Sequence, residues 1–294
     1  MWTSTLANGP WSIQSLPLGC ASTASGWCLL DVRCQKLNWL RAAAAGAVKI
    51  VNWNVQWATP KSPRQPEVLR RLETHEPEVV CLTETDVALL PWEGHVVCSA
   101  HSGYQGPESR RKVLLWSREP WRNVDRTGDS HMPPGRFIRA TTRTSAGDLT
   151  IMGVCIPWSG SRTGPAFTPR RQKWEDHYAY LECLDRLLGK TSLQRLVVVG
   201  DFNQQIRHGP RPSRLASALH EAVSSRLTIA TSALGWAGRR TIDHIGLSAD
   251  LHCEALGVID NIHDGRRLSD HFGVFADVHA AKPRARKVKI ETGG

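Results

Sequence analysis

The chain of 294 residues lacks the features that would assign it to several common protein classes. Its eight cysteines form no C-x-x-C pair and no other metal-ligand spacing, which argues against a zinc module. No apolar stretch reaches the ~18 residues of a membrane-spanning helix, so we expect no stable membrane insertion. The apolar run at 13–18 follows no basic segment, unlike a secretory signal. Cys81 and Cys155 lie in apolar runs, where cysteine acts as a small buried hydrophobe, so we expect a reduced, cytoplasmic protein.

Acidic residues are also in deficit. The sequence has 27 Asp and Glu against 37 Lys and Arg, a net charge of +10. This balance favours acidic partners such as phosphates or nucleic acid, although basic residues at 282–289 account for part of the excess. With 41% hydrophobic residues, the chain can bury a large core. The oligomeric state stays open.

Three regions differ in character. Residues 1–46 scatter tryptophans among Ser, Gly and Ala without a period, which predicts a poorly specified, disordered extension. Residues 47–280 carry regular patterns and form the expected domain. Residues 281–294 form a basic tail.

Within the domain, residues 48–52 and 78–83 are apolar strand-like runs, and an amphipathic helix at 67–76 separates them. This order predicts a βαβ unit. We predict further strands at 96–98, 112–116, 136–144, 149–156, 195–199, 241–247 and 272–278, and helices at 170–189 and 213–223. Alternating helices and strands without strict regularity predict an α/β fold built on mixed sheets.

Polar residues follow the strand predicted at 195–199. Asp201 and Asn203 are two apart, so in an extended chain their side chains point to the same side and can converge on one atom. An ordinary Asp/Asn turn would have the same sequence.

A second pairing joins two later segments. Asp243 lies between Ile242 and Ile245 on a predicted strand, where burying an acid is costly without a partner. His271, beside Asp270 in a loop, is the partner we expect, because a carboxylate fixes an imidazole's tautomer and stabilises its charged form. His244 points to the opposite face, and we expect it to be structural.

Two further strands end in candidate ligands. Glu84 ends the strand predicted at 78–83, and Asn54 interrupts the edge of the first strand. Each also has an ordinary explanation, since a lone Asn at a strand edge is common in turns.

Together and in this order, the motifs NWNV at 52–55, LTET at 82–85, GDFN at 200–203, TIDHI at 241–245 and SDHF at 269–272 resemble the endonuclease/exonuclease/phosphatase superfamily. The resemblance spans about 48–278. It implies a four-layer α/β sandwich, with two packed mixed β-sheets flanked by helices. It also implies a phosphoester hydrolase that depends on a divalent metal, Mg²⁺ or Mn²⁺.

By position, the resemblance implies a metal site at Asn54, Glu84 and Asp270. Asp201 and Asn203 would orient or activate the attacking water. His271, held by Asp243, would contact the scissile phosphate or carry a proton. Oxygen ligands of this kind suit Mg²⁺, which polarises a phosphate for in-line attack.

Cys155 departs from the pattern, because many members have Tyr or His there to hold the phosphate. Arg136 follows Gly135 as in the family, and we expect it to be structural. We predict a nucleic-acid phosphodiesterase, endo- or exonuclease, with the basic and aromatic loop at 157–174 contacting substrate. The alternatives are a phosphatase or sphingomyelinase-like hydrolase of a small or lipid phosphoester, and a catalytically silent binding module.

Overall fold

Two six-stranded mixed sheets form the centre of the protein. The computed structural model describes residues 46–103, 106–163, 172–206 and 213–281. Sheet A has the strand order β13-β16-β1-β2-β4-β3, and sheet B has the order β5-β6-β7-β8-β12-β9. The predicted extension and tail, apart from Gly46 and Ala281, lie outside the described residues.

The strands of sheet A are β1 (Ala47–Ala58), β2 (Val79–Asp86), β3 (His95–Cys98), β4 (Arg110–Ser117), β13 (Leu251–Ile259) and β16 (Gly273–Ala280). Those of sheet B are β5 (Arg122–Asp125), β6 (Phe137–Thr144), β7 (Gly147–Cys155), β8 (Leu196–Asp201), β9 (Thr228–Ile229) and β12 (Asp243–Leu247). Two small hairpins complete the strands, β10 (Gly235–Trp236) with β11 (Arg239–Arg240) and β14 (Ile262–His263) with β15 (Arg266–Arg267).

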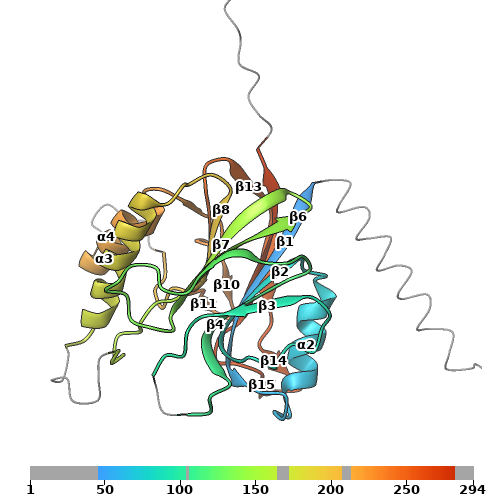
Figure 1. The fold of residues 1–294 in the computed structure, drawn as a ribbon. Helices are drawn as coiled ribbons and strands as arrows, with labels where there is room; N and C mark the ends of the chain where they lie inside the picture. Colours follow the sequence, from blue (N-terminus) through green and yellow to red (C-terminus); the bar gives the residue numbers. More distant parts are fainter. Residues whose placement is uncertain (1–45, 104–105, 164–171, 207–212, 282–294) are drawn as a thin grey trace, which may run out of the picture. The chain divides into compact units, whose positions relative to one another are not determined.

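The helices cover the outer faces of the two sheets. α2 (Gln65–Thr74) lies on one side, and α3 (Glu175–Lys190) lies on the other with α4 (Arg214–Leu219), which continues into the π-helical turn η1 (His220–Ser224) (Figure 1). One apolar core lies between the sheets, a second between sheet B and α3, α4 and η1, and a third between sheet A and α2. The predicted four-layer α/β sandwich is therefore confirmed.

The local patterns explain these layers. β1 and β2 are parallel neighbours in sheet A, and α2 connects them, which confirms the predicted βαβ unit. α2 buries Val68, Leu69 and Leu72, which recur at helical spacing on one face. β6 and β7, both predicted as strands, form an antiparallel hairpin. The strand-like apolar runs are buried because each sheet is covered on both faces.

The bounds of all three predicted helices differ from the prediction, and α2 covers Gln65–Thr74 instead of 67–76. α3 begins at Glu175 instead of residue 170, after Trp174 in a left-handed conformation (φ 69°). The helix predicted at 213–223 changes after Leu219 from α-helical to π-helical hydrogen bonding. Ser213 caps its start by accepting a hydrogen bond from the Ala216 N–H.

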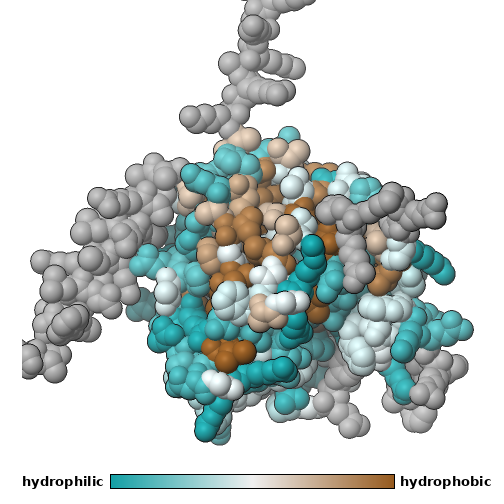
Figure 2. Space-filling model, turned by 180° about the vertical axis from the view of Figure 1, so that it is seen from behind, coloured by the Kyte–Doolittle hydropathy of each residue, from teal (hydrophilic) through white to brown (hydrophobic). Residues whose placement is uncertain are grey.

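Hydrophobic residues gather in the middle of the rear face and hydrophilic residues border them (Figure 2). None of the helices that the structure describes is long and apolar enough to span a membrane.

Candidate active site

The carboxylates at the ends of β8 and β12 lie at one level of sheet B. Asp201 ends β8, Asp243 begins β12, and the antiparallel register places them directly opposite each other. On the other side of β8, Cys155 at the end of β7 is level with Asp201. Strand pairing therefore brings together three residues that are far apart in the sequence.

Gly200 makes this arrangement possible. Its φ of +145° is rarely adopted by other residues, and a Cβ atom there would lie 1.9 Å from the carbonyl oxygen of Val154. The Gly-Asp pair in the motif therefore has a structural cause, because only glycine lets β8 approach β7 so closely before Asp201.

Two amides of β1 reach across from sheet A to this end of β8. Asn54 donates from Nδ2 to Oδ2 of Asp201 at 3.0 Å, and Asn52 donates from Nδ2 to the carbonyl oxygen of Gly200 at 2.9 Å. Both asparagines are buried. Asn52 was not among the residues predicted for the site, although its spacing of two residues from Asn54 places both side chains on the same side of the strand.

Asp201 is buried, and its carboxylate accepts several hydrogen bonds. Its Oδ1 accepts the backbone N–H of Asn203 at 2.8 Å, and its Oδ2 also accepts from Nδ2 of Asn203 at 3.0 Å. Burial and the charge of Asp243 raise the pKa of Asp201 to about 7, although His271 and the Asn203 N–H oppose the rise. At neutral pH this carboxylate is basic enough to accept a proton.

Asp243 and His271 form the predicted pair. Nδ1 of His271 lies 2.6 Å from Oδ2 of Asp243. Burial alone would lower the pKa of His271, but the charge of Asp243 and this hydrogen bond, with Asp201 and Asp270, raise it to about 10. Burial raises the pKa of Asp243, against the opposing charge of His271. The imidazole is therefore a cation at neutral pH.

The carboxylates of Asp201 and Asp243 suit a hard divalent cation, whereas the protonated imidazole of His271 has only N–H donors and is no ligand. Side-chain oxygens of Asp201 and Asp243 and a ring nitrogen of His271 lie within 4.8 Å of one another, and Oδ1 of Asp243 is buried without a hydrogen-bond partner. Carboxylate and amide oxygens are the ligands that Mg²⁺ and Mn²⁺ prefer. This compact group contains residues to which the sequence analysis gave catalytic roles, and Asn54 touches it through Asp201.

Glu84 lies beside this group and is paired with a lysine. Its Oε1 is 2.8 Å from Nζ of Lys112 on the neighbouring strand β4, and its backbone has a φ of +49°. The charge of Glu84 contributes to the raised pKa values of Asp201 and Asp243. Lys112 also lies 4.7 Å from the ring centre of Trp57. Nothing in its local sequence marks Lys112, because the contact depends on strand register.

Asp270 lies at the edge of the site. Its backbone N–H donates to Oε1 of Gln56 at 3.2 Å, and its carbonyl oxygen accepts from Arg239 at 3.2 Å. Gln56 and Trp57 have positive φ angles of 46° and 58° where β1 bulges against β2. Strained backbone of this kind is common at functional sites. Gln56 was not selected from the sequence, because the bulge breaks the two-residue alternation that would relate it to Asn54.

A buried network supports the segment after Asp201. Gln204 accepts at Oε1 from His177 of α3 (3.0 Å), and its carbonyl oxygen contacts Nε2 of His244 (3.0 Å). His244 thus faces away from Asp243, as predicted, and contacts Thr231 at 3.1 Å. These contacts fix the segment against both α3 and β12.

Cys155 is buried, and burial raises the pKa of its thiol to about 12. A neutral buried thiol is a weak hydrogen-bond donor and binds phosphate poorly. Arg136 is buried beside it and donates to the Cys155 carbonyl oxygen and to Ser161, both at 3.0 Å, which agrees with a structural role. In the loop at 157–174, Trp158 is 56% exposed, whereas Phe167, Arg170 and Arg171 lie outside the described residues.

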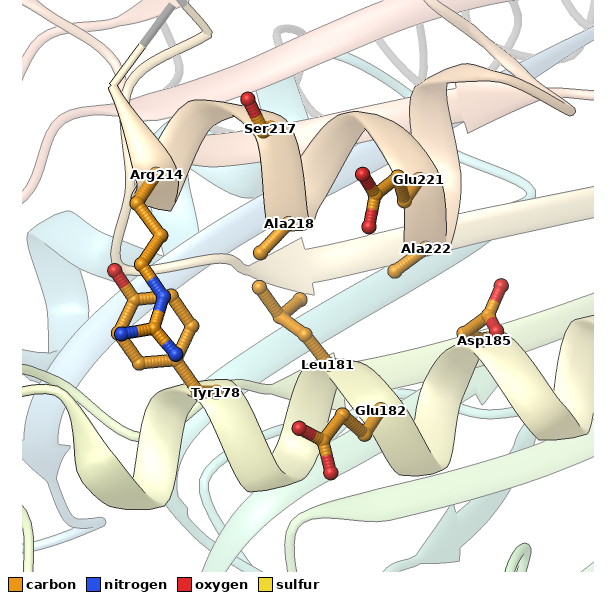
Figure 3. A pocket seen from close by; sticks show the side chains of 9 residues that line it. All are labelled: Tyr178, Leu181, Glu182, Asp185, Arg214, Ser217, Ala218, Glu221 and Ala222. Carbon is orange, nitrogen blue, oxygen red and sulfur yellow. The ribbon is translucent and has the colours of Figure 1, made fainter.

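A hollow of about 260 Å³ lies elsewhere, between α3 and α4 (Figure 3). Arg214 covers the ring of Tyr178 there at 4.8 Å, and Glu182, Asp185 and Glu221 line it. None of the strand-end residues lines it, so this hollow is separate from the candidate site.

Comparison with known proteins identifies the family of this chain and finds solved structures with a similar fold. Residues 51–271 match the Endonuclease/Exonuclease/phosphatase family. No curated protein matches the sequence.

Several solved structures share the fold at low sequence identity. An endonuclease/exonuclease/phosphatase from Beutenbergia cavernae DSM 12333 has 17% identity and a TM-score of 0.56, covering 80% of this chain and 72% of its own. A variant of the 3′ phosphatase NExo from Neisseria, bound to a product DNA hairpin, has 21% identity and a TM-score of 0.57, covering 78% and 98%. D. rerio TDP2 with a single-strand DNA product has 15% identity and a TM-score of 0.54, covering 80% and 99%.

Proposed function

The chain belongs to the endonuclease/exonuclease/phosphatase family, and from this premise we propose that it is a divalent-metal-dependent hydrolase of nucleic-acid phosphodiesters. The observation that carries the proposal is the meeting of Asp201, Asp243 and His271 within 4.8 Å, with Asn54 and Asn203 bonded to Asp201.

In this proposal, Asp201 and Asn203 position the attacking water, and the Asp201 carboxylate accepts its proton. The raised pKa of Asp201, about 7, suits this step near neutral pH. As the water oxygen bonds to phosphorus, the bond from phosphorus to the leaving oxygen breaks. His271, kept cationic by Asp243, contacts the phosphate oxygens and stabilises the negative charge that develops there.

Asn54, Glu84 and Asp270 would hold the metal, with the free Oδ1 of Asp243 close by. When bound, Mg²⁺ or Mn²⁺ would neutralise phosphate charge and polarise phosphorus. Lys112 keeps Glu84 paired through its ammonium group, which fixes the carboxylate next to the site.

A nucleic-acid substrate is supported by the net charge of +10. Two structural neighbours were solved with DNA products, a hairpin and a single strand. The buried thiol of Cys155 binds the scissile phosphate poorly. This supports a substrate that the protein also contacts outside the scissile phosphate, as a nucleic-acid strand allows.

The test is metal-dependent hydrolysis measured on single- and double-stranded DNA and RNA beside phosphomonoesters and sphingomyelin. We expect nucleic-acid cleavage with Mg²⁺ or Mn²⁺ and none with EDTA. Asp201→Ala and His271→Ala should each lower the rate at least ~10²-fold without loss of folding. Turnover of a monoester or of sphingomyelin with nucleic acid left intact would replace the nuclease proposal, and no turnover of any substrate would support a binding module.

A further inference from the structure

Two short hairpins flank the loop that carries Asp270 and His271. They are β10–β11 (235–240) and β14–β15 (262–267), and every residue in both is exposed. Neither hairpin supplies a residue to the group of strand-end carboxylates or to the three apolar cores. Their side chains are therefore free of the packing constraints that fix residues in the sheets.

Each hairpin ends in two arginines, Arg239 with Arg240 and Arg266 with Arg267, which we call the rim arginines. Among the described residues, no carboxylate forms an ion pair with any of the four. The nearby acids have other partners, since Asp264 contacts His263 and Asp260 contacts Arg71. The rim thus presents positive charge that no carboxylate of the described residues neutralises by an ion pair.

An exposed aromatic ring accompanies these charges. Trp236 is 39% exposed and is the cross-strand partner of Arg239. Its indole Nε1 donates to Oδ1 of Asp260 at 3.1 Å, which anchors one edge of the ring. Large indole rings are ordinarily buried for their apolar area, so a ring anchored in solvent is a candidate stacking surface.

The rim is tied directly to the proposed active site. Nη1 of Arg239 donates to the carbonyl oxygen of Asp270 at 3.2 Å, one residue before His271. Asn261, between β13 and β14, donates to the carbonyl oxygen of Ser269 at 2.7 Å. Both hairpins are therefore held against the loop that places His271, and a polymer bound at His271 would continue over them.

We propose that the rim arginines and Trp236 bind a nucleic-acid strand next to the scissile phosphate, with arginines on the backbone phosphates and the indole stacked on an unpaired base. This rests on the proposed function and adds a preference for single-stranded substrate, because only an unpaired base offers its face to the ring. Arginine–phosphate contacts carry affinity without selecting sequence, so the preference is for strandedness and not for sequence.

Binding of a fluorescently labelled single strand of about 12 nucleotides, within the length that single-strand grooves accommodate, is measured by anisotropy in EDTA and tests this without turnover. Arg240, Arg266 and Arg267 are changed together to Gln, and Trp236→Ala is made separately. The triple variant should weaken binding at least ~10-fold at low salt and reduce the slope of log affinity against log salt by about 2. Trp236→Ala should weaken binding of the single strand about tenfold and change binding of a blunt duplex much less.

The matched control changes Arg122, Arg143 and Lys190 to Gln, which removes the same charge from β5, β6 and the end of α3. These positions are not at the C-terminal ends of β7 and β8, since Arg143 pairs with Asp148 at the start of β7 and Arg122 pairs with Thr141 of β6. Circular dichroism confirms that each variant is folded. Equal loss in control and rim variants, unchanged affinity in the rim variant, or no binding by the wild type would each overturn the inference.

A separate assay keeps the two proposals distinguishable. Hydrolysis of bis(p-nitrophenyl) phosphate by the wild type with Mg²⁺ or Mn²⁺, compared with Asp201→Ala, reports on the chemical centre alone. If the wild type hydrolyses this substrate but the rim substitutions do not weaken strand binding, the inference is wrong and the proposed hydrolase stands. If the rim variants selectively lose strand binding but the wild type hydrolyses no phosphoester, the strand-binding surface stands and the proposed hydrolase is wrong.

Discussion

His271 and Asp243 are joined by a contact of 2.6 Å between Nδ1 and Oδ2, although they lie 28 positions apart in the sequence. The other oxygen of Asp243 is buried without a partner, and Asp201 lies opposite Asp243 across the strand pair. The contact therefore does two things. It holds the imidazole as a cation, and it places that cation close to two buried carboxylates that would otherwise repel each other.

Asp243→Asn should expose this dependence. The amide can keep a contact with His271 but removes the charge, so the pKa of His271 should fall from about 10 towards its ordinary value. NMR titration of the His271 ring in EDTA measures this directly. Phosphodiester hydrolysis should fall at least ~10²-fold.

The control is Asp270→Asn, since Asp270 also raises the pKa of His271 but as the last of the contributing groups. Its effect on the titration should be smaller. If the His271 titration is the same in Asp243→Asn as in the wild type, the pairing does not set the charge of His271.

Lys112 should limit metal binding through Glu84. Its ammonium nitrogen lies 2.8 Å from Glu84 Oε1 and competes with a divalent ion for the same carboxylate. Lys112→Met should lower the Mg²⁺ concentration for half-maximal activity, and Glu84→Gln should raise it, each on the order of tenfold. Mg²⁺ titration of hydrolysis measures both.

Lys49→Met is a matched control, because Lys49 pairs with Asp277 at 2.6 Å at the far end of β1. It should leave the Mg²⁺ requirement unchanged. An unaltered requirement in both Lys112→Met and Glu84→Gln would remove Glu84 from the metal site.

Gly200 should tolerate no side chain. Gly200→Ala would place Cβ 1.9 Å from the backbone oxygen of Val154, where no flexible group can move aside, at a φ that strains alanine. We expect a loss of unfolding free energy of at least about 3 kcal/mol, measured by urea denaturation.

Gly189 in α3 is the comparison, since a Cβ there meets nothing within 4 Å. Gly189→Ala should be neutral or stabilise by up to about 1 kcal/mol, because alanine favours helix. Similar stability of the two variants would show that β7 and β8 can separate at Gly200 at little cost.

Local patterns reveal the parts of the fold that depend on short stretches of chain. The apolar runs of β2, β7 and β8 and the two main helices follow from periodicity. β13 escapes this approach because polar or small residues such as His252, Glu254 and Gly257 interrupt its edge-strand pattern. Most of its residues are not fully buried, so it lacks the continuous apolar run that marks the central strands.

The candidate site divides in the same way. The ordered motifs reveal Asp201, Asp243 and His271, because each polar residue stands out at the end of an apolar strand. Lys112 stays hidden, since its contact with Glu84 depends on how β4 pairs with β2. The bulge at Gln56 and Trp57 is also hidden, because neither residue type favours a positive φ.

Acid should destabilise the protein through His244. Burial lowers the pKa of His244 to about 4, whereas the unfolded value is near 6.5. The unfolded state therefore binds the extra proton first as pH falls. The stabilising contribution of neutral His244 is complete above about pH 6.5 and is lost as pH falls from there to about 4, amounting to about 3 kcal/mol.

Other buried groups titrate in the same window, so the prediction concerns a difference between variants. Burial also lowers the pKa of His177, which acts in the same direction. Asp201 acts in the opposite direction, because its pKa is raised to about 7 and its protonation favours the folded state.

His244→Gln removes one titration and leaves the others. Urea denaturation at about pH 7 and about pH 4.5 should show that the variant loses about 2 kcal/mol less stability than the wild type across this interval. The variant's absolute stability does not enter, because glutamine alters the contacts with Gln204 and Thr231 at both pH values. Equal losses in the two proteins would mean that His244 is hydrated or charged in the folded state, and that the Gln204 network does not keep it neutral.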